Sequence, residues 1–323
     1  MLLTVLTGIG LLCGALWVFS LWRTHAVERA FPVLGDRLSL NGGDLHVVER
    51  GNGIPVVMLH GASGNLRDWT ASIFDDVAGR HRAVAVDRPG HGWSDSWQDG
   101  GHDPRRQAAI LHDAFQRLGI ERPVLVGHSF AGTVVLAYAL RYPENTGGIL
   151  FLSGVSHPWP GGVGRHHEIA ALPVVGALFA HLCVPLAYLV RAEAAVRSVF
   201  HPNRPPTGYA DKTGIALYSR PSAVRTNARE LTRLKPIVMQ MEGEYRAITA
   251  PLIALTGDSD GVIYTHLHTP PLVDKVPGAE LRVLDTVGHC PHHVAPEAVL
   301  TAIDDLVRRR VGAAAEIRAD GSA

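Results

Sequence analysis

Short runs of apolar residues alternate along this chain with segments whose apolar side chains recur every three to four positions. The runs lack a polar face, as in strands that are covered on both sides. They comprise residues 56–60, 83–87, 124–127, 148–153, 251–257 and 279–284. Helical spacing is found in residues 68–78, 104–118, 133–140 and 296–309. This alternation predicts an α/β fold with a mainly parallel central sheet and helices on both faces.

The alternation is interrupted between residues 157 and 247. Residues 157–164 (HPWPGGVG) have the composition of a linker. Residues 169–190 are strongly apolar, but Pro173 and Pro185 favour a pair of short helices over one continuous span. Residues 222–241 also have helical character. We therefore expect a helical cap inserted between two parts of the sheet.

The N-terminal residues 2–22 carry no charged side chain and are just long enough to cross a bilayer core as a helix. Trp17 and Trp22 lie toward one end, where aromatic belts occur. A cleaved signal peptide is the alternative, but no basic residue precedes the run and no small-x-small site ends it. We predict an uncleaved anchor, with the basic residues at 23 and 29 favouring a cytoplasmic catalytic domain over a periplasmic one.

Residues 37–51 alternate in polarity around an Asn-Gly-Gly turn and predict a hairpin ahead of the first buried strand. These patterns together give five predicted regions. They are a membrane anchor (1–25), a first core part (26–156), a helical cap (157–247), a second core part (248–312) and a flexible tail (313–323).

The charge balance and the spacing of cysteines and histidines limit the classes of partner and ligand expected for this 323-residue chain. Lys plus Arg equals Asp plus Glu at 30 each, and no basic patch of the kind that nucleic acids require is evident. Cys13, Cys183 and Cys290 are too few and too scattered for a disulfide framework or a zinc site. The 18 histidines show no metal-binding spacing. We therefore expect no metal, no organic cofactor and no nucleic-acid partner.

A serine stands where the apolar run 124–127 meets the helical segment 133–140. A sharp strand-to-helix turn holds its central residue in a strained conformation and requires small neighbours. Gly127 and Ala131 are both small, although the usual pattern has glycine at the second of these positions. The pattern predicts a nucleophile elbow with Ser129 as the nucleophile, and an ordinary Gly/Ser turn is the alternative.

A serine hydroxyl needs a neutral histidine as base, and that imidazole needs a third group to fix its tautomer. His289 follows the last strand, and Asp260 follows the strand before it. In a parallel sheet these loops open at the same carboxyl edge as Ser129. Asp258 is the rival acid, but it directly follows the end of the strand, whereas Asp260 lies further out in the loop.

Acyl transfer also requires hydrogen-bond donors for the developing oxyanion. One is the backbone N–H of the residue after the nucleophile, which is Phe130. The second is expected from the loop that follows the first buried strand, where Ala62 is the candidate. Both donors are main-chain groups, so the shape of the loop matters more than the side chain at position 62.

Five motifs together resemble the α/β-hydrolase superfamily, most closely its capped esterases, lipases, C–C hydrolases and perhydrolases. They are residues 60–64 (HGASG), 87–94 (DRPGHGWS), 127–132 (GHSFAG), 257–260 (GDSD) and 288–289 (GH). The resemblance implies that Ser129, Asp260 and His289 form a catalytic triad and that Ala62 and Phe130 supply the oxyanion hole. It makes residues 87–94 structural, with Trp93 as a substrate contact. A serine at the elbow argues against epoxide hydrolases and haloalkane dehalogenases, which carry aspartate there. For His128 and Cys290, beside the proposed catalytic residues, we expect packing roles.

The sequence thus predicts a serine hydrolase that cleaves carboxylic esters through an acyl-enzyme intermediate. The apolar cap suggests a small-molecule ester with a hydrophobic portion. A C–C bond hydrolase or perhydrolase with the same triad, transfer of the acyl group to an acceptor other than water, and a non-catalytic ligand-binding protein of this fold remain as alternatives.

Overall fold

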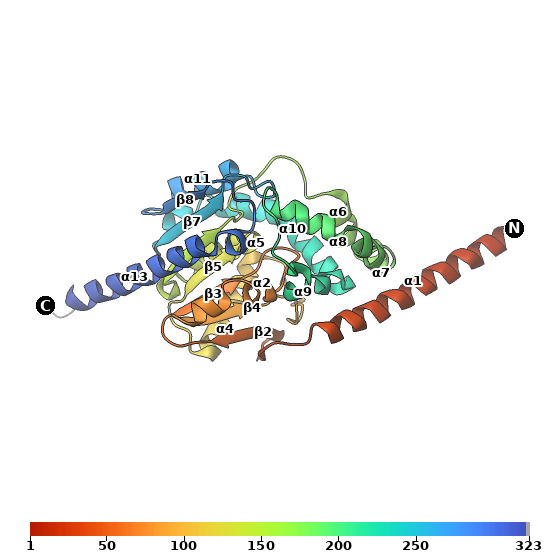
Figure 1. The fold of residues 1–323 in the computed structure, drawn as a ribbon, viewed down its shortest axis with the longest axis horizontal. Coiled ribbons are helices and arrows are strands. Elements are labelled where there is room, and N and C mark those ends of the chain that lie inside the picture. Colours follow the sequence, from red (N-terminus) through yellow and green to blue (C-terminus); the bar gives the residue numbers. More distant parts are fainter. Residues whose placement is uncertain (321–323) are drawn as a thin grey trace.

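A single eight-stranded sheet forms the centre of the computed structural model, which describes residues 1–320 (Figure 1). Its strands are β1 (Asp36–Leu40), β2 (Gly43–Arg50), β3 (Pro55–Leu59), β4 (Arg82–Val86), β5 (Val124–His128), β6 (Gly148–Leu152), β7 (Leu252–Gly257) and β8 (Glu280–Leu284). Their spatial order is β1-β2-β4-β3-β5-β6-β7-β8. Only the pairs β1–β2 and β2–β4 are antiparallel, which confirms the predicted mainly parallel sheet.

Hydrophobic side chains leave the central strands on both faces, as the apolar runs predict. On β5, Leu125 belongs to the core beneath α4 (Pro104–Leu118) and α5 (Phe130–Arg141). Its neighbours Val124 and Val126 point to the opposite core, which α3 (Phe74–Ala78) and α13 (Pro296–Asp320) cover. Each such fully buried aliphatic side chain contributes about 1.5–3 kcal/mol to folding. The two cores hold the carboxyl ends of the strands in fixed positions.

Some predicted helices have different limits in the structure. The expected helix 68–78 is two short helices, α2 (Arg67–Thr70) and α3, separated by residues 71–73, where the Ser72 N–H bonds the Trp69 carbonyl in a tighter turn. The sequence did not predict α11 (Thr265–Lys275), which contains two prolines, or α12 (Pro291–Val294), which has only four residues. The expected tail 313–323 coincides with the last turns of α13 as far as Asp320, and residues 321–323 lie outside the described part.

Every regular element of residues 157–241 is a helix, and together these helices form the cap. They are α6 (Arg165–Ala171), α7 (Val174–Leu182), α8 (Val184–Phe200), α9 (Tyr209–Thr213), η2 (Ile215–Ser219) and α10 (Pro221–Met241). The apolar stretch 169–190 is split, with Pro173 just before α7 and Pro185 in the first turn of α8. The axes of α7 and α8 differ by 63°. Two further 3-10 turns, η1 (Pro143–Asn145) and η3 (Tyr245–Ala247), belong to the core.

The N-terminal helix α1 (Leu2–Ala30) extends away from the body of the molecule (Figure 1). Its apolar 18-residue window has a mean hydropathy of 2.2 and is 0% buried in the protein. By length and composition this helix can cross a membrane. The bent pair α7–α8 passes the same test only when its two helices are taken together.

Candidate active site

Ser129 occupies the sharp turn between β5 and α5, as the sequence predicts. Its backbone has φ 55° and ψ −119°, a conformation that residues other than glycine rarely adopt. A Cβ at Gly127 would lie 2.5 Å from the carbonyl oxygen of Ala131, and one at Gly132 would lie 2.8 Å from Cα of Gly154. Glycine is therefore needed at positions 127 and 132, and alanine at 131 fits without strain because its methyl group packs in the core.

Asp260 and His289 are brought together from the loops after β7 and β8. Nδ1 of His289 lies 2.7 Å from Oδ2 of Asp260, and both side chains are at least 95% buried. The other carboxylate oxygen accepts the N–H groups of Val262 and Ile263 at 2.8 and 2.9 Å. This carboxylate is therefore fixed before any substrate binds. The rival Asp258 is exposed and accepts hydrogen bonds from the Thr286 N–H and the Ser259 hydroxyl instead.

The reactive atoms proposed on the other two residues remain free. Among residues 1–320, neither Oγ of Ser129 nor Nε2 of His289 forms a hydrogen bond. Nε2 of His128, the residue before the nucleophile, donates to the carbonyl of His289 at 2.8 Å, and the two rings are 4.8 Å apart. His128 thus links the loop that carries His289 to the elbow that carries Ser129.

The loop after β3 passes directly against the elbow. A Cβ added to Gly61 would lie 3.0 Å from Cβ of Ser129 and 3.5 Å from its Oγ. Within the described residues, the N–H groups of Ala62 and Phe130 donate no hydrogen bond to the protein. The main chain at Gly61 therefore lies beside the Ser129 side chain, and the role of Ala62 and Phe130 as oxyanion donors stays a prediction.

A buried arginine that the sequence analysis did not single out supports this loop. Arg88 donates to the carbonyls of His60 and Gly61, and its guanidinium lies 4.4 Å from the centre of the Phe130 ring. Its charge is neutralised by Glu230 of α10 at 2.7 Å. Nε2 of His60 accepts a hydrogen bond from the backbone N–H of Arg88. Burial and the nearby Arg88 guanidinium hold the pKa of His60 well below 6.5. Burial of such a charge is tolerated because it is paired with a carboxylate and donates to two backbone carbonyls.

The cap reaches the same loop by a second route. Oδ1 of Asn227 on α10 accepts the Ser63 N–H at 2.7 Å, and the Asn65 side chain donates to the carbonyl of Thr213. The position of the cap and the shape of the candidate oxyanion loop are therefore coupled. Asn227 and Glu230 are one helical turn apart and look like ordinary polar positions of an amphipathic helix, so only tertiary contacts reveal them.

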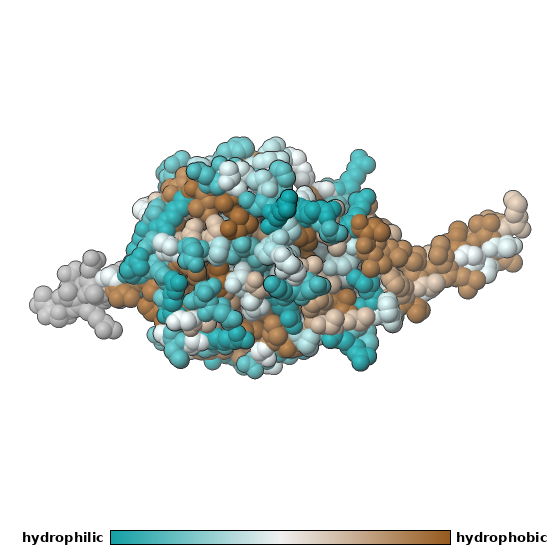
Figure 2. Space-filling view, in the orientation of Figure 1, coloured by the Kyte–Doolittle hydropathy of each residue, from teal (hydrophilic) through white to brown (hydrophobic). Residues whose placement is uncertain are grey.

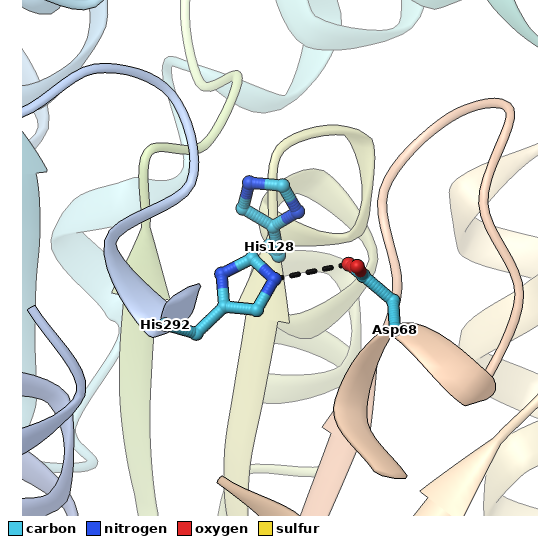
Figure 3. Close-up of side chains that lie close together, drawn as sticks. All are labelled: Asp68, His128 and His292. Atoms are coloured by element: carbon cyan, nitrogen blue, oxygen red, sulfur yellow. Dashed lines mark hydrogen bonds and ion pairs between the residues drawn. The ribbon is translucent and has the colours of Figure 1, made fainter. Parts of the chain in front are cut away.

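A second carboxylate–histidine group contains Asp68 and His292, which Figure 3 shows with His128. The His128 ring lies 4.8 Å from that of His289 and 4.6 Å from that of His292, centre to centre, so the two groups are neighbours. The Asp68 carboxylate accepts hydrogen bonds from Nε2 of His292 at 3.0 Å, from Nε2 of His293 at 2.8 Å and from the Tyr209 hydroxyl at 3.1 Å. Burial alone would raise the pKa of Asp68, but the two histidines hold it well below 3.8. Burial lowers the pKa of His292, so an ionised carboxylate accepts from a neutral imidazole. These bonds fasten the chain just after His289.

Asp68, His128 and His292 also offer three ligand atoms within 4.8 Å of one another, the arrangement of a possible metal site. Nδ1 of His128 is buried without a partner among the described residues and would suit a metal, since its Nε2 already donates to a carbonyl. His292 does not suit one. A metal at its Nε2 would leave a protonated Nδ1 that is buried without an acceptor. The hydrogen-bonded network accounts for this cluster better than a metal site does.

Two other predicted positions lie around this centre. The Trp93 indole donates to the carbonyl of Phe31 at the end of α1 and lies 5.5 Å from the Arg220 guanidinium, and its role as a substrate contact stays a prediction. Burial raises the pKa of the Cys290 thiol well above 9.0, with Asp68 and Asp260 adding to the effect. That thiol is kept protonated and unreactive, consistent with a packing role.

Comparisons with known proteins agree with this fold. A family model described as alpha/beta hydrolase fold matches residues 54–296. An uncharacterized protein of Mycobacterium tuberculosis is 25% identical over 281 residues, covering 79% of this chain and 75% of that protein. A 2-hydroxy-6-oxononadienedioate/2-hydroxy-6-oxononatrienedioate hydrolase of Paraburkholderia phymatum is 34% identical over 126 residues, which are 38% of this chain and 41% of that enzyme.

Among solved structures, a thermophilic esterase from Thermogutta terrifontis superposes with a TM-score of 0.68 at 20% identity. The superposition covers 85% of this chain and 97% of the esterase, and at this identity it shows a common fold. The family model spans both halves of the sheet and the cap between them. The chain therefore belongs to the α/β-hydrolase fold family.

Proposed function

We propose that this protein is a membrane-anchored serine hydrolase that cleaves carboxylic esters with a hydrophobic portion. The observation that carries the proposal is the orientation of His289. Asp260 holds its Nδ1, while Nε2 has no partner among residues 1–320 and lies on the loop that His128 ties to the elbow of Ser129. A neutral histidine held by its Nδ1–H is the base that a serine nucleophile needs.

In the proposed reaction Oγ of Ser129 attacks the ester carbonyl carbon while Nε2 of His289 takes the hydroxyl proton. The N–H groups of Ala62 and Phe130 stabilise the oxyanion, and loss of one such donor typically costs about 2.7–4 kcal/mol of transition-state stabilisation. The tetrahedral intermediate expels the alcohol, which receives the proton from His289. Water then attacks the acyl-enzyme, its proton passing to His289, and the acid leaves as Ser129 recovers its hydrogen.

The test is the variant Ser129→Ala assayed on p-nitrophenyl esters of different chain lengths. We expect the full chain to remain folded and hydrolysis to fall by at least about 10³-fold, as for loss of a nucleophile. A fluorophosphonate probe should label the parent and not the variant. Activity retained by a clean preparation of the variant would remove Ser129 from the mechanism, and failure to label the parent would favour a non-catalytic ligand-binding protein.

The second candidate is a C–C bond hydrolase with the same triad. It is favoured by the similarity to the Paraburkholderia hydrolase, whose name denotes a 2-hydroxy-6-oxo-dienedioate substrate. Rates on simple esters, on a vinylogous 1,5-diketone and in peracid formation separate the ester hydrolase, the C–C hydrolase and the perhydrolase. Adding an alcohol acceptor to the ester assay detects acyl transfer in competition with water.

The proposed anchor is α1, whose apolar residues are exposed over its first five turns. The basic residues Arg23 and Arg29 at its C-terminal end favour a cytoplasmic catalytic domain. Protease treatment of intact spheroplasts tests this orientation. A cytoplasmic domain survives until the cells are lysed, whereas a periplasmic domain is digested at once.

A further inference from the structure

The cap has an exposed apolar surface of its own, in addition to the exposed apolar surface of α1. Large aliphatic side chains project outward from α7 and α8, and Val190 is 80% and Val174 72% exposed. We call the following group the cap apolar surface: Val174, Val175, Leu178, Leu186, Leu189 and Val190. Clusters of this kind mark a contact surface, whereas single exposed aliphatic residues do not.

This surface is continuous with the apolar surface of α1. Figure 2 shows the hydrophobic atoms of the N-terminal helix running on to the neighbouring part of the cap. Trp17 stacks on His181 of α7 with ring centres 3.8 Å apart, and Ser20 lies 3.3 Å from the same ring. Arg23 lies over the Tyr188 ring of α8 at 5.1 Å. The contacts fix α7 and α8 against one short stretch of α1.

The position of that stretch along α1 sets the depth of the cap. Trp17 and Arg23 are separated by six residues, which is about 9 Å of helical rise. If α1 spans the bilayer, residues 2–22 cross its hydrocarbon core of about 30 Å, so Trp17 lies just inside the acyl-chain boundary and Arg23 just outside it. Because α7 contacts α1 at this level, its exposed side chains are brought to the boundary between headgroups and acyl chains. Amphipathic helices bury their apolar side about 5–10 Å into that layer.

We propose that the cap apolar surface inserts into the leaflet from which α1 emerges, so that a phospholipid bilayer is its partner. This inference rests on the proposed anchoring by α1. The exposed Arg191 and the nearby Arg23 place positive charge at the rim of the surface, where anionic headgroups lie. The proposed triad is buried, and the inserted cap lies in the bilayer, so the substrate class that this arrangement fits is an acyl ester dissolved in the bilayer.

The test uses the full chain in vesicles of phosphatidylcholine and phosphatidylglycerol. Nitroxide labels are attached one at a time to Ile9→Cys, Val175→Cys, Val190→Cys and the control Met239→Cys. The background carries Cys13→Ser and Cys183→Ser, and Cys290 is buried and stays unlabelled. Met239 is a matched control because it is 57% exposed on α10, outside the cap apolar surface. A label that collides mainly with dissolved oxygen lies in lipid, and a label that collides mainly with a water-soluble nickel chelate lies in water.

We expect labels at positions 9, 175 and 190 to collide preferentially with oxygen and the label at 239 with nickel. If position 9 reports lipid while 175 and 190 behave like 239, the anchor stands and this inference is overturned. If position 9 also reports water, the proposed anchoring fails and the inference fails with it. Labels at 175 and 190 that are shielded from both reagents show that a second copy of the chain covers the surface, which also overturns the inference.

Activity gives an independent readout. The variant Leu178→Gln/Leu189→Gln/Val190→Gln changes only exposed side chains, so we expect unchanged hydrolysis of a soluble butyrate ester. Hydrolysis of a long-chain ester dissolved in vesicles should fall by at least about tenfold because the cap loses its apolar contact with lipid. Met239→Gln should change neither rate. Equal rates of parent and triple variant on the vesicle substrate contradict the proposal.

Discussion

Two carboxylate–histidine groups lie side by side at one edge of the sheet, and they use their histidines in opposite ways. Asp260 binds Nδ1 of His289 and leaves Nε2 without a partner among residues 1–320. Asp68 instead binds Nε2 of both His292 and His293. The first imidazole keeps the nitrogen that points away from its own backbone for chemistry, whereas the second pair spends that nitrogen on structure.

Burial and an acidic partner are therefore not sufficient to propose a histidine as a base. What matters is which ring nitrogen the carboxylate occupies, because the other one must reach the nucleophile. Asp260 also takes two backbone N–H groups from its own loop, whereas Asp68 takes the Tyr209 hydroxyl from the cap. The first group leaves a ring nitrogen available, as the proposed mechanism requires, and the second holds loops together.

The largest effect is expected for Asp260→Asn, which tests whether Asp260 orients His289. An amide donates toward Nδ1 and favours the tautomer with its proton on Nε2, so His289 loses its function as a base. We expect kcat on a good ester to fall roughly ten-thousand-fold, with the melting temperature nearly unchanged. Steady-state kinetics and thermal unfolding measure the two effects. A loss of less than tenfold would show that Asp260 is not the orienting acid.

Asp68→Asn tests the structural group with the same chemical change. We expect at most about a tenfold loss of activity but a decrease of about 1–3 kcal/mol in the free energy of unfolding, because buried donors lose a charged acceptor. Urea titration gives the free energy, and ester kinetics gives the activity. If instead activity falls as far as in Asp260→Asn while stability is kept, the roles assigned to the two groups are reversed.

The residue between the two groups predicts a pH dependence of stability. Burial and the neighbouring His292 and His289 hold the pKa of His128 well below 6.5. As the pH falls, this histidine is therefore protonated in the unfolded chain at a higher pH than in the folded protein. Its contribution to the free energy of unfolding is complete above about pH 6.5 and is lost as the pH drops below that value. His128→Asn should reduce this slope by up to about 1.4 kcal/mol per pH unit. Unfolding measured at a series of pH values checks it, and an unchanged slope contradicts it.

The smallest expected effect is that of Asp258→Asn. This carboxylate is exposed and bonds the Thr286 N–H and the Ser259 hydroxyl, and the amide oxygen of asparagine can accept the same bonds. Activity should change by less than about twofold. Ester kinetics beside Asp260→Asn makes this the matched control for a loop carboxylate, and a large loss would restore Asp258 as the rival acid.

Much of the fold was readable in the chain because it depends on local patterns. Apolar runs such as 124–127 locate strands with two covered faces, and Gly127 beside Ser129 locates the turn between strand and helix. The break of helix 68–78 was not readable because the apolar spacing of these residues continues across it. The double-proline helix α11 was missed because propensity argues against it and tertiary packing overrides propensity.

The sequence by itself determined the alternation of strands and helices, the three residues proposed as the triad and their order along the chain, because spacing and residue type are local properties. Tertiary structure alone decided that Arg88 and Glu230 support the loop after β3 and that α1 lies against the cap. Such contacts join residues as many as 225 positions apart, as between Asp68 and His293. Pairings over that separation are set by how packed layers fit together, and a single sequence carries no direct record of them.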